Sequence, residues 1–152
     1  MKKIFSLEAL GIGVLLMLYF MIVDLIGMAD QIELRFFNIV ILAAGMWYAL
    51  YRKATKGKKF GVEYLDGFKQ GLQLTFGAAV TFAALFVIYS FATDHALVQE
   101  LVGTANIPDF ITIWHLAAVI IFEGMASGLI LSLIMMQYFK YEQHKSKGME
   151  LR

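Results

Sequence analysis

The apolar residues of this chain fall into four long runs that are separated by short polar segments. The runs cover residues 7–28, 34–51, 72–92 and 111–139. A helix rises about 1.5 Å per residue, so about 20 apolar residues cross the roughly 30 Å hydrocarbon core of a bilayer. The pattern predicts an all-α fold: an integral membrane four-helix bundle that forms a single four-span transmembrane domain over residues 1–152.

Two shorter segments are expected to complete this bundle. Residues 60–70 carry aromatic side chains at intervals of four, which predicts a short amphipathic segment at the inner membrane surface before the third span. Asp94 can cap a short helix over residues 96–102 in the outer loop before the last span. The mixed, basic tail over residues 140–152 is expected to fray.

Composition and charge support the membrane class and suggest an orientation. The chain is 60% hydrophobic and 16% charged, whereas a soluble domain is about half apolar and about a quarter charged. With four spans, all Lys and Arg residues except Arg35 fall on the side of the two termini and of the basic connector at residues 52–59. The positive-inside rule then predicts a multi-pass protein of the bacterial inner (cytoplasmic) membrane with cytoplasmic N and C termini. The connector is typical of membrane topology, so we expect the lipid bilayer and no nucleic acid as its partner.

Small residues at intervals of four form two seams on the predicted helices. The seam of the third run contains Gly67, Gly71, Thr75, Ala79 and Ala83. The seam of the last run contains Gly124, Gly128 and Ser132. Residues four apart share one helix face, and small residues let two membrane helices approach closely. We expect one seam to pack inside the bundle and the other to meet a protein partner or a sister copy.

Glu123 is the strongest candidate for chemistry, because it lies near the middle of the last apolar run. A carboxylic acid at this depth is costly, so we expect it to point into protein, where Gly124 and Gly128 allow a second helix to approach. Two interpretations remain open. Glu123 is either a functional group, in a proton or cation path or in a contact with a partner helix, or a neutral structural residue that is hydrogen-bonded to a neighbour such as Ser127.

Three further polar residues could join Glu123. His115 lies two turns outward on the same run, and Asp24 and Asn38 are expected at similar outer depth on the first two runs. One hypothesis is a polar column from the outer surface to the midplane; the alternative is four unrelated residues. A single His with separated carboxylates is a weak metal pattern, and no nucleophile is paired with a base. We therefore predict no catalytic residue, metal or cofactor, and the absence of cysteine excludes thiolate ligands and disulfides.

The segment that follows the basic connector has a distinctive pattern. Residues 60–72 read Phe-Gly-Val-Glu-Tyr-Leu-Asp-Gly-Phe-Lys-Gln-Gly-Leu. This segment resembles the signature of a family of small four-span inner-membrane proteins, found mainly in Bacteroidetes and catalogued as a domain of unknown function. In that family Phe-Lys-x-Gly opens the third helix, as Phe68 to Gly71 do here, and a Pro-containing acidic loop precedes the last helix, of which Pro108 and its neighbours are a weak version. The resemblance implies four helices and supplies no catalytic residue.

These patterns favour an interaction protein over an enzyme. Small size, two small-residue seams and the lack of a catalytic set predict an accessory or interaction subunit of a larger membrane assembly, without enzymatic activity. The alternative is a channel or proton-coupled transporter that uses Glu123. Four helices enclose too little space for a wide pore, so that alternative requires an oligomer.

Overall fold

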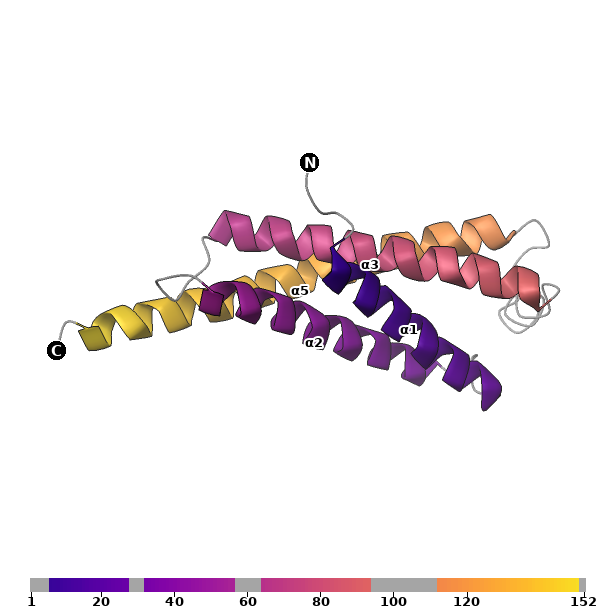
Figure 1. The fold of residues 1–152 in the computed structure, drawn as a ribbon, viewed down its shortest axis with the longest axis horizontal. Helices are drawn as coiled ribbons and strands as arrows, with labels where there is room; N and C mark the ends of the chain where they lie inside the picture. The colour runs from indigo at the N-terminus through magenta and orange to yellow at the C-terminus, as the bar shows by residue number, and fades with distance from the viewer. Residues whose placement is uncertain (1–5, 28–31, 57–63, 94–111, 151–152) are drawn as a thin grey trace.

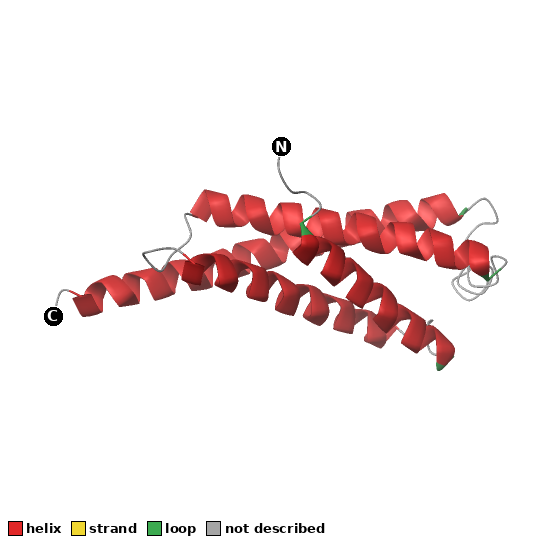
Figure 2. Ribbon diagram, viewed as in Figure 1, coloured by secondary structure: helices red, strands yellow, loops and turns green. Residues whose placement is uncertain are grey.

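The computed structural model describes residues 6–27, 32–56, 64–93 and 112–150, which form four α-helices and no strand (Figures 1 and 2). The helices are α1 (Leu7–Leu25), α2 (Ile32–Lys56), α3 (Tyr64–Ala92) and α5 (Ile113–Glu150). The predicted all-α class is therefore confirmed. The short helix expected at residues 96–102 lies outside the described residues.

Three of these helices have the length and composition needed to cross a membrane. They are α1, α3 and the Ile113–Phe139 part of α5. The apolar part of α2, Phe36–Arg52, is shorter. At about 1.5 Å per residue it measures about 26 Å, slightly less than the roughly 30 Å hydrocarbon core. The predicted membrane class thus agrees with three described helices, and the fourth helix is the shortest in its apolar part.

The helices extend beyond the apolar runs. Helix α2 continues to Lys56, inside the basic stretch that was expected to be a loop, and α5 continues to Glu150, where a frayed tail was expected. Helix α3 begins at Tyr64, so residues 64–70 form its first turns and run into the apolar span as expected, whereas their place at the inner membrane surface stays a prediction. The reason is that Lys, Arg, Glu and Gln are good helix formers, whereas hydropathy marks only the part of a helix that suits lipid.

The small-residue seams of α3 and α5 pack against each other. The two helices lie side by side and run in opposite directions (Figure 1). The facing pairs are Gly71 with Ser132, Thr75 with Gly128, and Ala79 with Gly124. A Cβ atom built on Gly124 would lie only 2.8 Å from the Cβ atom of Ala79, so the helices are as close as glycine allows. Both seams therefore pack against each other within the chain. This differs from the expectation that one of them is free to meet a partner or a sister copy.

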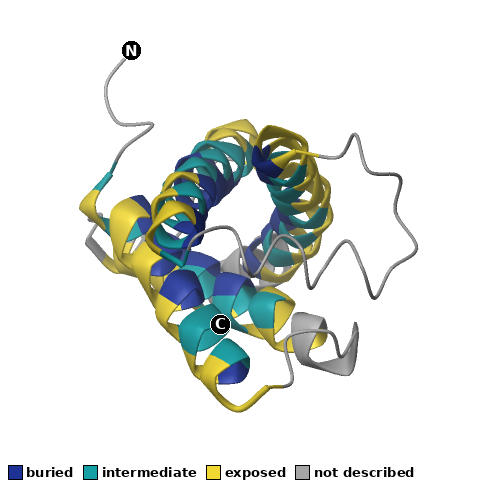
Figure 3. Cartoon of the chain, turned by 90° about the vertical axis from the view of Figure 1, so that its right-hand side faces the viewer, coloured by how far each residue is buried: buried dark blue, intermediate teal, exposed yellow. Residues whose placement is uncertain are grey.

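The apolar core has two parts, and α2 belongs to only one of them. The first cluster joins all four helices and includes Met46 and Leu50 of α2 with Phe139 of α5. The second cluster is centred on Met17, Phe86 and Ile113 and, among the described residues, contains side chains from α1, α3 and α5 only. Viewed along the bundle, buried residues lie on the helix sides that face one another (Figure 3).

Aromatic rings connect α2 to α5 at one end of the bundle. The ring of Trp47 lies 4.8 Å from the ring of Tyr138 and 5.4 Å from that of Phe139, measured between centroids. Toward the other end α2 and α5 diverge (Figure 1). The candidate site lies in the half of the bundle where these two helices diverge.

Candidate functional site

A groove lies in the half of the bundle where α2 and α5 diverge. Its volume is about 170 Å³, it is open on one side, and all four described helices line it. Most of the lining is apolar, with Leu16, Phe20, Phe82 and Ile120 among the contributors. The polar side chains in the lining are Tyr19, Asn38, Thr75, Glu123 and Ser127. An apolar groove with a few convergent polar groups is the usual form of a binding site.

Glu123 is exposed in the single chain, so the expectation that neighbouring helices enclose it is not met. The reason is helical geometry: Gly124 faces α3, and a step of one residue turns the side chain by about 100°. Glu123 therefore lies beside the α3–α5 contact, in a stripe with Leu116 and Ser127 that lines the groove. No hydrogen bond or ion pair from a described residue reaches its carboxylate, and Ser127 does not serve as its partner.

Asn38 contributes a second polar group to the same groove. It is half-buried on α2, and its side-chain oxygen Oδ1 is buried without a hydrogen-bond partner among the described residues. A buried acceptor in this state costs about 1–3 kcal/mol. The groove therefore contains two hydrogen-bond acceptors, one on α2 and one on α5, that lack donors.

The two other residues of the predicted polar column make different contacts. Asp24 accepts a hydrogen bond of 2.9 Å from the hydroxyl of Tyr89, which joins the ends of α1 and α3. His115 caps the start of α5, because its Nδ1 accepts a hydrogen bond of 3.2 Å from the backbone N–H of Thr112. Of the four predicted residues, the structure brings Asn38 and Glu123 to one groove and places neither Asp24 nor His115 in its lining.

Tyr89 was missed by sequence reasoning, although a signal for it exists. Successive spans alternate in direction, so the ends of the first and third runs reach the same side of a bundle. Asp24 and Tyr89 are the acid and the phenol near those two ends. A search for acceptor and donor pairs at matching ends would have found this contact.

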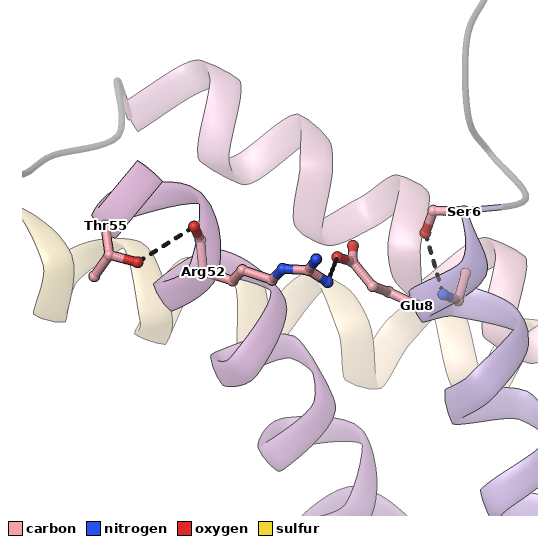
Figure 4. A network of polar contacts seen from close by, with 5 residues as sticks. Ser6, Glu8, Arg52 and Thr55 are labelled. Carbon is pink, nitrogen blue, oxygen red and sulfur yellow. Dashed lines mark hydrogen bonds and ion pairs between the residues drawn. The ribbon is translucent and has the colours of Figure 1, made fainter. Parts of the chain in front are cut away.

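An ion pair at the opposite end of the bundle was also missed. Nη1 of Arg52, in α2, lies 3.4 Å from Oε1 of Glu8, in α1, and both side chains are partly exposed (Figure 4). The same close view shows Ser6, whose hydroxyl accepts a hydrogen bond of 3.1 Å from the backbone N–H of Ala9 and caps α1. The two residues of the ion pair lie at the start of the first run and the end of the second, which again are matching ends.

No family model, curated protein or solved structure matches this chain. The resemblance to the family of small four-span proteins stays a prediction. In the part of the chain that the structure describes, no group of three or more His, Asp or Glu side chains is arranged to hold a metal ion. The chemistry that the groove offers is acceptance of hydrogen bonds by the exposed carboxylate of Glu123 inside an apolar surface.

Proposed function

We propose that this protein is a small four-span protein of the bacterial inner membrane that acts as an interaction subunit of a larger membrane assembly. In this proposal a transmembrane helix of a partner protein docks in the groove between α2 and α5, and the chain has no enzymatic activity of its own. The distribution of Lys and Arg supports cytoplasmic N and C termini, because Arg35 alone falls on the other side of four spans.

The observation that carries the proposal is the exposed carboxylate of Glu123, which makes no hydrogen bond or ion pair to a described residue. Glu123 follows Ile113, the first residue of α5, by a helical rise of about 15 Å, which is half the thickness of the hydrocarbon core. A charged side chain at the centre of a bilayer costs about 2.5–3.5 kcal/mol on insertion scales. A partner helix in the groove would remove this carboxylate from lipid and supply the donors that the described residues do not.

The packing of the seams directs a partner to the groove. Gly71 and Gly128 are buried in the contact between α3 and α5, so a partner cannot use them without separating these helices. Outside that contact α5 remains largely uncovered, with Val119 57% exposed at the edge of the groove. The surface available to a partner is therefore the groove and the adjacent side of α5.

Photocrosslinking in native membranes tests this proposal. A photoreactive amino acid at Val119 probes the groove, and the same amino acid at Leu18 is the matched control, because Leu18 is 52% exposed but does not line the groove. We expect a protein adduct of defined mass from position 119 and none from position 18. Adducts with lipid alone at both positions would refute the proposal, and a band at twice 17.1 kDa would identify a sister copy instead.

Ion flux is the measurement that separates this proposal from the transporter alternative. In the interaction proposal, proteoliposomes with the wild-type protein show no more proton or cation flux than empty vesicles. Flux that is present in the wild type and lost in Glu123→Gln would favour the channel or transporter.

A further inference from the structure

We infer that the helix that docks in the groove carries a Lys or Arg side chain at the depth of Glu123. This inference rests on the proposed function, because it names the chemistry of the partner at that site. It goes beyond that function by predicting what one residue of an unidentified protein must be.

Charge complementarity is the first argument. The groove contains the carboxylate of Glu123, which makes no hydrogen bond or ion pair to a described residue and needs a donor. The hydroxyl of Thr75 cannot supply one, since it already donates a hydrogen bond of 2.9 Å to the carbonyl oxygen of Gly71. Lys offers three donors and Arg five, and neither accepts a hydrogen bond. A cation therefore supplies hydrogen bonds to Glu123 and neutralises its carboxylate.

Depth argues against a lipid headgroup as the source of this cation. The charged groups of lipids lie at the membrane interface, about 15 Å from the midplane of the hydrocarbon core. Glu123 lies about that far below the first residue of α5. A helix can present a side chain at any depth along its length, whereas a headgroup would have to leave the interface.

The composition of this chain argues against a second copy. Helix α1 and the Ile113–Phe139 part of α5 contain no Lys or Arg, and the only one in α3 is Lys69, near its start. Arg35 and Arg52 lie toward the two ends of α2. A sister copy would place apolar side chains or a second carboxylate against Glu123, so the cation must come from a different protein.

Guest helices in vesicles test the inference without knowledge of the partner. The full-length protein is reconstituted in phosphatidylcholine vesicles with a synthetic Leu/Ala transmembrane helix that carries one central Lys. Matched guests carry Met at the same position, or the Lys one turn from the helix end. Binding is measured by energy transfer between dyes on guest and protein. The central Lys guest is expected to bind about tenfold tighter than the Met guest, since polar contacts between membrane helices contribute about 1–2 kcal/mol.

Variants of the acid then assign the preference to the groove. Glu123→Gln should abolish the preference for Lys, and Glu123→Lys should reverse it in favour of a guest with a central Glu. Glu8→Gln is the matched control, because it removes an acid that lies outside the groove, and it should keep the preference. The comparison of central and terminal Lys guests uses only the wild-type protein, so it holds even if a variant at position 123 does not fold.

The outcomes separate this inference from the proposed function. If guests with Lys and Met bind equally and both crosslink to position 119, the inference is overturned and the docking groove stands. If no guest crosslinks to position 119, the groove is not a docking site and both proposals fail. Preference for a terminal Lys over a central one would place the cation at the interface, and it would also overturn the inference.

Discussion

Gly128→Ala is expected to destabilise the protein, because the contact between α3 and α5 has no room for a methyl group at this position. A Cβ atom on residue 128 would lie 2.5 Å from both Cβ and Oγ1 of Thr75. Non-bonded carbon atoms prefer about 3.5–4.0 Å, so the helices would have to separate by about 1 Å. Overpacking of this kind costs about 1–3 kcal/mol.

Gly11→Ala is the matched control, since it makes the same chemical change on a free helix face. Gly11 is exposed on α1, and a Cβ atom built there meets nothing within 4 Å. Ala is favoured over Gly inside a helix by about 0.5–1 kcal/mol, so this variant should be neutral or slightly stabilised. The two variants should therefore differ by about 1–4 kcal/mol in the free energy of unfolding.

The measurement is reversible unfolding in mixed micelles, with sodium dodecyl sulfate as the denaturant and loss of helical circular dichroism as the signal.

Thr75→Gly removes the atoms that a new methyl group at position 128 would meet. The double variant should therefore be more stable than the sum of the single changes predicts, by about 0.5–3 kcal/mol. If Gly128→Ala unfolds at the same detergent fraction as Gly11→Ala, the arrangement of α3 against α5 described above is wrong.

Three further predictions concern two contacts between helices and the orientation of the chain. Tyr89→Phe should cost about 1 kcal/mol of unfolding free energy in the same assay, because it removes the hydrogen bond to Asp24; no change would mean that this bond contributes nothing. Arg52→Ala should change stability by less than about 1 kcal/mol, since its ion pair is partly exposed, and a larger loss would contradict this reasoning. In a chain without cysteine, Lys58→Cys should resist a membrane-impermeant maleimide in spheroplasts and Thr104→Cys should react; the opposite labelling would invert the proposed orientation.

The apolar runs predicted the helices well and their ends poorly. The cores of α1, α3 and α5 fall within the predicted runs, because about 20 consecutive apolar residues have few alternatives to a helix that can cross a membrane. The ends at Lys56, Tyr64 and Glu150 could not be found in this way. At these ends the backbone remains helical although the side chains are polar, and hydropathy measures the side chains.

Part of the candidate site was within reach of sequence reasoning. Both Glu123 and Asn38 were selected as polar residues in apolar runs, and the structure places them in one groove. The exposure of Glu123 also follows from the sequence: if Gly124 faces a neighbouring helix, the residue before it must point to the side of that contact. The divergence of α2 from α5 could not be predicted, because it depends on which helix occupies the second core cluster.

The attachment of α2 by its Trp47 end has a mechanical consequence. Asn38 lies about 12 Å along the helix from Met46, which belongs to the cluster that holds all four helices. Phe37, the neighbour of Asn38, packs on Tyr19 of α1 with ring centroids 6.1 Å apart, so α2 is held beside the groove as well as at its Trp47 end. A movement of α2 that widened the mouth would have to break this contact with α1, so the width of the groove is set by the packing of α2 on α1 and not by its rings against α5.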